Sequence, residues 1–166
     1  MTNVESALAG CLIRNPSKWD IRFLRLAEFW SAFSKDPSTK CGAVLAKGKE
    51  VVNQGYNGFS EEVEDRPEWY ADRAIKLGFV VHAEVNAVKR AGHLARGSTL
   101  YTWPIPSCED CAAVMLRAGV ARFVAPYPDS ARLERWGDSF LESLRTVRSR
   151  DVPFELVPRA LLGLPE

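Results

Sequence analysis

The spacing of apolar residues in the first third of the chain changes from a helical to a strand period. From Ser17 to Phe33, apolar side chains recur every three or four residues, and Ser17 followed by Asp20 is typical of a helix N-terminus. Two apolar segments, Gly42–Ala46 and Glu50–Gln54, then flank a Lys-Gly-Lys turn. We therefore expect one long helix followed by a β-hairpin.

The segment Tyr56–Lys76 shows no regular period and is acidic. We expect it to form an irregular surface excursion that ends in a short helix. A loop of this length inside a compact domain is usually a lid or a binding segment, so the excursion is a functional candidate.

The second half of the chain alternates between helical and strand patterns. The predicted helices cover residues 83–94, 109–118 and 130–147, and the predicted strands cover 98–103, 122–125 and 154–157. A hairpin supplies the first two strands, whereas helical crossovers connect the later ones, so the sheet is expected to be mixed. The fold class predicted from this order is α/β: a three-layer α/β/α sandwich with about five strands.

Composition and charge narrow the classes of function. The 166 residues carry 22 Lys and Arg against 21 Asp and Glu, 46% are hydrophobic, and no stretch approaches the roughly 18 apolar residues of a membrane helix. We expect one domain, residues 1–166, and a cytoplasmic location, since Met1–Gly10 lacks the basic start of a signal peptide. The even charge argues against a long nucleic acid and favours a small-molecule partner.

The four cysteines include one closely spaced pair, Cys108 and Cys111. A C-x-x-C pair in a chain without an export signal is either a redox site or part of a metal site. A zinc site needs two further ligands, or one ligand and a water. Cys11 and Cys41 are expected to be small buried apolar residues.

A histidine and a glutamate lie at the start of the predicted helix before the cysteine pair. His82 and Glu84 open that helix, and Cys108 and Cys111 open the next one. Three protein ligands leave a fourth tetrahedral position for water, as in catalytic zinc sites. Glu84 is then placed to carry protons rather than to bind the metal. Taken singly, His82 would be a core or capping residue and Glu84 a charge at a helix N-terminus.

H-x-E followed by C-x-x-C is the signature of zinc-dependent nucleobase deaminases. The sequence resembles the cytidine and deoxycytidylate deaminase superfamily, and most closely its deoxycytidylate (dCMP) deaminase branch, from Trp19 to about Val157. The segments that carry the resemblance are Trp19-Asp20, Phe23-Leu24, Ser34 to Lys40, Gly42 to Val44, Gly55 to Gly58, His82 to Ala87, Leu100 to Trp103, Cys108 to Ala112, Ala118 to Val120, Arg135-Trp136 and Ser139-Phe140.

The resemblance implies a zinc-dependent hydrolase that converts dCMP to dUMP and ammonia, in which zinc-bound hydroxide attacks C4. It also implies a homo-oligomer. Carried over by position, the roles are Zn²⁺ binding for His82, Cys108 and Cys111, proton transfer for Glu84, contact with the pyrimidine carbonyl for the Ala83 N–H, contact with the deoxyribose for Asn57, and phosphate binding for Lys35, Ser38 or Lys40.

Three segments depart from the family pattern. A proline and a glycine are missing from Gly58–Glu62, which leaves open whether dCTP and dTTP regulate the chain. The metal motif reads Pro106-Ser107-Cys108 where the family has proline directly before cysteine, so Ser107 is either a one-residue insertion or a replacement of that proline, which bears on the choice of base. The turn Ser149–Val152 replaces the family's E-A-G-V sequence.

Other functions remain open at this point. A deaminase of the same kind could act on another free base or nucleoside. One acting on a base in RNA or single-stranded DNA would need a basic face, for which the candidates are Arg132, Arg135, Arg145 and Arg148. A non-catalytic zinc or redox module is the third possibility, although it would have no use for Glu84.

Overall fold

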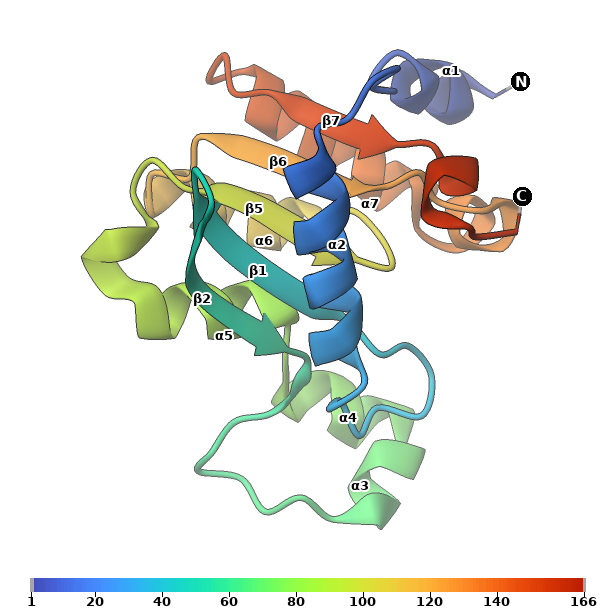
Figure 1. Cartoon of the computed structure of the whole chain (residues 1–166). Coiled ribbons are helices and arrows are strands. Elements are labelled where there is room, and N and C mark those ends of the chain that lie inside the picture. Colours follow the sequence, from blue (N-terminus) through green and yellow to red (C-terminus); the bar gives the residue numbers. More distant parts are fainter. Residues whose placement is uncertain (1, 166) are drawn as a thin grey trace.

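The computed structural model describes residues 2–165, and its centre is a five-stranded sheet (Figure 1). The strand order is β2-β1-β5-β6-β7. β1 is antiparallel to both β2 and β5, whereas β5, β6 and β7 are parallel. The strands are β1 (Gly42–Lys47), β2 (Glu50–Tyr56), β5 (Thr99–Trp103), β6 (Arg122–Pro126) and β7 (Phe154–Val157). The prediction of a mixed five-stranded sheet is confirmed.

Helices cover both faces of this sheet. One face packs against α2, and the opposite face packs against α5, α6 and α7 (Figure 1). The helices are α2 (Lys18–Ser31), α5 (Ala83–Ala91), α6 (Glu109–Arg117) and α7 (Ser130–Arg148), with 3-10 turns at Gly92–Ala95 and Arg159–Leu162. The predicted three-layer sandwich is therefore correct. A further helix, α1 (Asn3–Ala9), was not predicted; it packs against α7.

Strand β1 shows how one strand serves both layers. Its side chains alternate between the two faces, so Ala43 and Leu45 join the core under α5, α6 and α7, whereas Val44 and Ala46 join the core under α2. All four are 2% exposed or less. The sheet is buried on both sides, as a strand with five consecutive buried residues requires.

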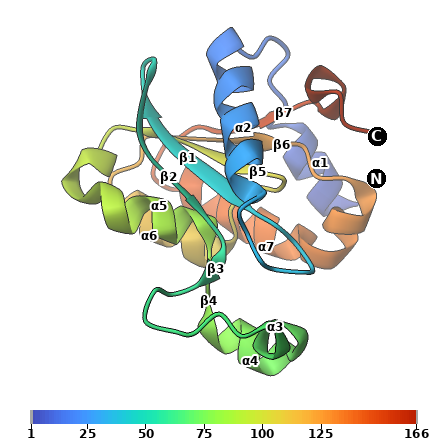
Figure 2. The same cartoon turned by 60° about the horizontal axis from the view of Figure 1, so that its bottom comes forward.

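The segment between β2 and α5 is more ordered than its sequence indicates. It contains two short helices, α3 (Pro67–Ala71) and α4 (Arg73–Phe79), and its ends pair as a two-stranded ribbon, β3 (Gly58–Phe59) with β4 (Val80–Val81). Figure 2 shows the helices projecting from the body on this ribbon. The expectation of an irregular segment with one short helix was too simple, because Asp72 caps α4 and the Phe59 and Tyr70 rings stack 3.9 Å apart.

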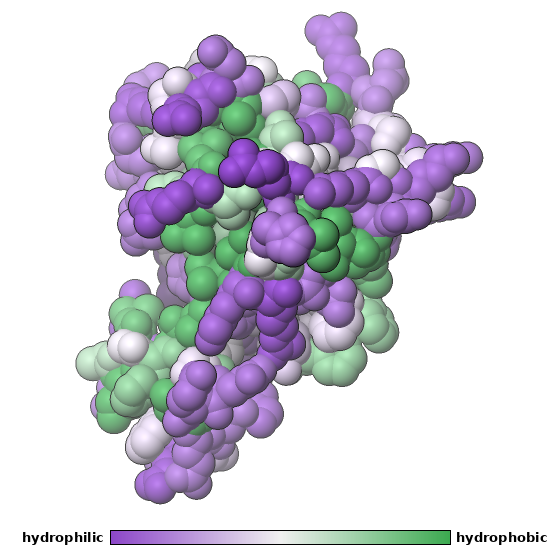
Figure 3. All heavy atoms as spheres, turned by 90° about the vertical axis from the view of Figure 1, so that its left-hand side faces the viewer, coloured by the Kyte–Doolittle hydropathy of each residue, from purple (hydrophilic) through white to green (hydrophobic). Residues whose placement is uncertain are grey.

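On the face shown in Figure 3, hydrophilic side chains predominate, and apolar side chains gather across the middle of the face and at its lower left, the end of the molecule to which α3 and α4 belong. Ile75, Leu77 and Phe79 of α4 are among the exposed apolar residues. Within residues 2–165, no helix has the length and apolar character needed to cross a membrane.

Two glycines allow helices to approach the hairpin closely. A Cβ on Gly42 would lie 1.9 Å from the carbonyl oxygen of Ala27 in α2, and a Cβ on Gly55 would lie 2.5 Å from that of Ala83 in α5. Both obstacles are backbone atoms, which cannot move without shifting a helix. The positions of α2 and of the α5 N-terminus against the sheet thus depend on the missing side chains.

Gly55→Ala is expected to destabilise the chain by about 1–3 kcal/mol, because overpacking forces α5 away from β2. Gly78→Ala is the matched control, since a Cβ there meets nothing within 4 Å. Urea denaturation of both variants measures the effect. Equal stability of the two would show that α5 does not depend on the close approach at Gly55.

A buried charge cluster ties α2 to the strands. Asp20, 3% exposed, accepts hydrogen bonds from Arg122 at 2.6 Å and from the Tyr101 hydroxyl at 2.9 Å, and Arg122 also pairs with Glu155. Burial raises the pKa of Asp20, but the hydrogen bonds from Arg122, the Ser17 N–H and Tyr101, with the charge of Arg122, outweigh it and hold this pKa below its usual value. Folding is thereby linked to ionisation of Asp20.

Arg122→Ala is expected to lower the free energy of unfolding by about 2–4 kcal/mol, because it leaves the Asp20 carboxylate buried without its cation. Since the pKa of Asp20 is lower in the folded chain, the contribution of the ion pair is present above the unfolded pKa and is lost as the pH falls through the folded pKa. Chemical denaturation between pH 3 and pH 7 measures both effects. Arg66→Ala, whose pair with Glu64 is exposed, should change stability by less than about 1 kcal/mol; similar losses in the two variants would refute the assignment.

Candidate metal centre and cavity

Two helix N-termini meet at the site. His82 is the N-cap of α5 and Cys108 is the N-cap of α6, which places Cys111 one turn into α6. The Nδ1 atom of His82 lies 3.2 Å from the Cys111 Sγ and 3.5 Å from the Cys108 Sγ. One potential ligand atom from each of the three residues lies within 4.8 Å of the others. The structure thus brings together all three predicted metal ligands.

The two sulfurs differ in electrostatic environment. Hydrogen bonds from Cys111 and His82 lower the pKa of Cys108 to about 4, so this side chain is a thiolate at neutral pH. The same hydrogen bond with Cys108, together with burial, raises the pKa of Cys111. The hydrogen bond that His82 donates to Cys108 also raises the pKa of His82 to about 9. The three side chains therefore share protons, and a bound dication would displace those protons from the ligand atoms.

The donor set fits zinc. Two thiolate sulfurs and one imidazole nitrogen are ligands that Zn²⁺ prefers, and three protein ligands leave one tetrahedral position open. The donor chemistry therefore indicates zinc as the cofactor.

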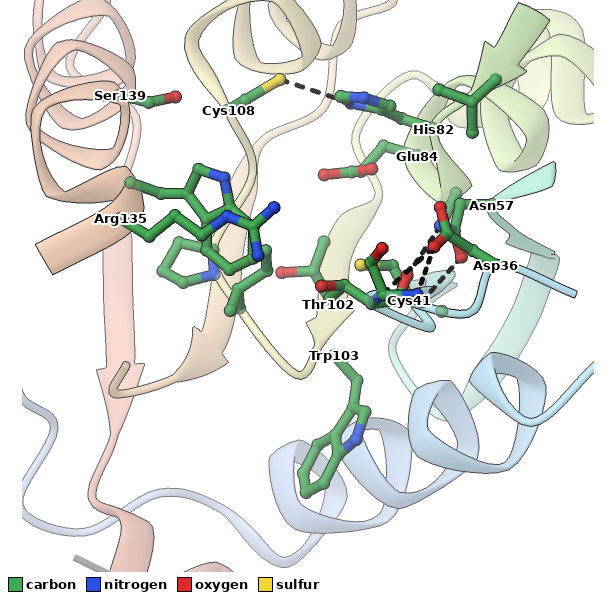
Figure 4. Close-up of a pocket in the computed structure, with 18 of the residues that line it drawn as sticks. Asp36, Cys41, Asn57, His82, Glu84, Thr102, Trp103, Cys108, Arg135 and Ser139 are labelled. Atoms are coloured by element: carbon green, nitrogen blue, oxygen red, sulfur yellow. Dashed lines mark hydrogen bonds between the residues drawn. The ribbon is translucent and has the colours of Figure 1, made fainter. Parts of the chain in front are cut away.

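A cavity of about 290 Å³ is lined by two of the three ligands, His82 and Cys108. Glu84 lines it from the first turn of α5, and in Figure 4 its carboxylate lies below Cys108 and His82 and faces the cavity. Glu84 is 6% exposed, and burial raises the pKa of its carboxyl group. A buried carboxyl group at a cavity wall with a raised pKa has the properties of a general acid and base.

Two predicted substrate contacts also line the cavity. Ala83 is the first residue of α5, and a backbone N–H at that position has no acceptor within its own helix. Asn57 accepts a hydrogen bond from the Cys41 N–H at 2.7 Å and donates one to the Thr39 carbonyl at 2.9 Å. Its amide keeps one N–H and one acceptor lone pair for a ligand.

Of the three candidates for phosphate binding, Ser38 alone is among the residues that line the cavity. Its hydroxyl accepts a hydrogen bond from Lys76 at 3.0 Å. Lys35 is exposed and pairs with Asp65 at 2.7 Å, and Lys40 is exposed as well; neither lines the cavity. The two lysines are thus not placed to meet a ligand bound there.

The cavity has three basic residues that the sequence did not identify as ligands of a small molecule; of these, Arg135 was a candidate only for a nucleic-acid-binding face. Lys76 forms a buried ion pair with Asp36 at 3.2 Å, and the side chains are 8% and 7% exposed. Arg73 reaches the cavity from the same helix, α4, and Arg135 reaches it from α7. The only sequence signals were the i, i+3 spacing of Arg73 and Lys76 and the Arg135-Trp136 pair, which the resemblance included without a role.

Cys41 is not simply a core residue, contrary to expectation. It lines the cavity at the start of β1, whereas Cys11 is buried in the core as predicted. Burial and the nearby charge of Glu84 raise the pKa of the Cys41 thiol, so it is neutral at physiological pH.

Ser107, the residue at which the motif before Cys108 departs from the family pattern, is 2% exposed.

The arginines that would indicate nucleic-acid binding do not form one open basic face. Arg132 pairs with Asp129, and Arg145 pairs with Glu142. Arg148 contacts the sulfur of Cys11, while Arg135 lines the cavity. Three of the four charges are thus directed to partners within the fold, which weakens the polynucleotide hypothesis.

Comparison with known proteins agrees with the site. Residues 17–126 match the family described as "Cytidine and deoxycytidylate deaminase zinc-binding region". An uncharacterized deaminase in the luxG 3′ region of Aliivibrio fischeri is 36% identical over 122 residues, which are 74% of this chain and 82% of that protein. A probable deoxycytidylate deaminase of Caenorhabditis elegans is 38% identical over 107 residues, 61% of this chain and 53% of its own.

The chain spans 53% to 64% of the length of the nematode, fly and orangutan deoxycytidylate deaminases that it matches. Among solved structures, the dCMP deaminase of cyanophage S-TIM5 in complex with dCMP and dUMP has a TM-score of 0.58 at 20% identity, over 87% of this chain and 99% of that one. Acinetobacter baumannii RibD has a TM-score of 0.60 at 22% identity, over 88% of this chain and 36% of that one. These two likenesses establish the fold.

The family match covers the hairpin, the histidine and glutamate of α5 and the cysteine pair of α6, and the fold has the same mixed sheet as the solved relatives. The chain therefore belongs to the cytidine and deoxycytidylate deaminase family of zinc-dependent hydrolases.

Proposed function

We propose that this chain is a deoxycytidylate deaminase that hydrolyses dCMP to dUMP and ammonia. The observation that carries the proposal is that a buried carboxylate, Glu84, lines the same cavity as His82 and Cys108, which converge with Cys111 on one metal-ligand cluster. Sequence similarity to deoxycytidylate deaminases supports dCMP as the substrate. We assign the activity to residues 1–166 as a single deaminase domain.

When bound by His82, Cys108 and Cys111, zinc supplies the Lewis acidity that makes water a nucleophile near neutral pH. Glu84 accepts a proton from the attacking water and delivers it to N3 of the cytosine ring as the new C–O bond forms at C4. It then passes a second proton from that oxygen to the amino group. The C4–N bond breaks, ammonia leaves, and the added oxygen remains as the carbonyl of uracil.

The other wall residues orient the nucleotide. The Ala83 N–H donates to the pyrimidine carbonyl, because it lies at the start of α5 next to Glu84. The remaining donor and acceptor of Asn57 bind the deoxyribose. The hydrogen bond that Asn57 accepts from the Cys41 N–H and the one it donates to the Thr39 carbonyl hold its amide in one orientation. A homo-oligomeric state and a cytoplasmic location stay predictions.

Glu84→Gln in the zinc-loaded chain should lower kcat for dCMP by about 10²–10⁴-fold, because the amide cannot carry the proton. Zinc content, measured by atomic absorption, should stay at the wild-type value. The assay follows ammonia release from dCMP, CMP, deoxycytidine and cytidine, and dCMP is expected to give the highest kcat/KM.

Asp110→Asn is the matched control, since Asp110 holds the same second helical position in α6 but is exposed and does not line the cavity. Asp110→Asn should leave kcat within about threefold of wild type, because a charge at a helix N-terminus does not by itself carry the proton. If both variants lost the same factor in kcat, Glu84 would act only as a charge at a helix N-terminus, and its assignment as the proton carrier would be wrong. A zinc-loaded wild-type chain that releases no ammonia from dCMP would refute the proposed substrate.

A further inference from the structure

The cavity contains more cations than its internal ion pairs use. Three basic side chains line it: Arg73 and Lys76 from α4, and Arg135 from α7. A nucleotide phosphate carries a charge of about −1.5 to −2 at neutral pH and binds best to groups that donate charged hydrogen bonds. Which of the three is available therefore determines where a phosphate can bind.

The charge of Lys76 is already compensated. Its ammonium pairs with Asp36 at 3.2 Å and donates to the Ser38 hydroxyl at 3.0 Å. Asp36 in turn accepts the backbone N–H groups of Ser38 and Thr39. Moving Lys76 to a phosphate would leave a buried carboxylate without its cation, which is unfavourable.

Arg135 is held in place without an ionic partner. Its Cζ lies 4.5 Å from the ring centroid of Trp136, so the guanidinium is in cation–π contact with the indole. Among residues 2–165 it forms no ion pair within 4.0 Å. Figure 4 shows the side chain extending from α7 into the cavity, across from Asn57 and Asp36. The N–H groups at the edge of such a guanidinium remain available for two parallel bonds to an anion.

The supporting element distinguishes Arg135 from Arg73. Arg135 lies in the 19-residue helix α7, whose Phe140 and Leu144 are 1% and 2% exposed in the core. Arg73, which is exposed as Arg135 is, is the first residue of the seven-residue helix α4 in the excursion. A binding group on a packed element keeps its position better than one on a projecting segment.

We propose that Arg135, oriented by Trp136, is the residue that binds the 5′-phosphate of the substrate and selects nucleotides over nucleosides. The inference rests on the proposed function, since it takes a pyrimidine nucleotide as the ligand. It assigns the phosphate to the α7 wall of the cavity, away from Lys35 and Lys40.

Binding of the product dUMP, measured by isothermal titration calorimetry on the zinc-loaded chain, tests the assignment without turnover. Arg135→Ala should raise the Kd for dUMP on the order of 10–100-fold, and the Kd for deoxyuridine should change less than about threefold. The ratio of kcat/KM for dCMP to that for deoxycytidine should fall by the same factor. Arg135→Lys, which keeps the charge but not the fork, should lie between wild type and Arg135→Ala.

Salt dependence separates phosphate binding from a structural role. The wild-type Kd for dUMP should rise with ionic strength, and the rise should be smaller in Arg135→Ala. Arg145→Ala on the same helix is the matched control: Arg145 is 58% exposed, pairs with Glu142 and does not line the cavity, so it should bind dUMP as wild type does.

Each outcome decides the proposal. A wild-type dUMP affinity in Arg135→Ala, or a loss confined to Arg73→Ala, would overturn it while leaving the deaminase proposal intact. A parallel loss of deoxyuridine binding would reduce Arg135 to a structural residue. A wild-type chain that neither deaminates dCMP nor binds dUMP would overturn both proposals.

Discussion

The site depends on one constraint: two helices must begin at the same place. His82 and Cys108 are 26 residues apart in the sequence, and each is the N-cap of its helix, so each ligand is fixed by the point where a loop ends and a helix starts. The contact between α5 and α6, and the packing of both on one face of the sheet, bring these points together. The metal ligands, the buried carboxylate and the Ala83 N–H all follow from this arrangement.

The surrounding fold holds the two helix starts from both sides. Gly55 allows the backbone of β2 to approach the first turn of α5, and Asn57 ties the loop before β1 to the strand end beside the cavity. The excursion adds the α4 wall, where the buried Lys76–Asp36 pair joins α4 to the same loop. The α4 and loop walls of the cavity thus lie on elements that carry none of the three metal ligands.

Features with a short-range physical signature were predictable from the sequence. The hairpin, the α/β alternation and the three ligands follow from periodicity, turn residues and spacing. The excursion was predicted less well, because its order arises from the contact between Phe59 and Tyr70 and from the ribbon that joins residues more than 20 positions apart. The position of the basic side chains in the cavity was not predicted for the same reason. Whether Lys35 or Arg135 faces the cavity depends on which side of a loop or helix packs inward, and spacing near a motif does not determine that.

We expect two cysteines and one histidine to hold zinc with one position open. X-ray absorption at the zinc edge of the loaded chain measures the ligand set. The spectrum should show two sulfur atoms at about 2.3 Å and two nitrogen or oxygen atoms at about 2.0–2.1 Å. Three sulfur atoms would contradict this expectation, because Cys41 would then close the site as a fourth protein ligand and leave no place for the reacting water.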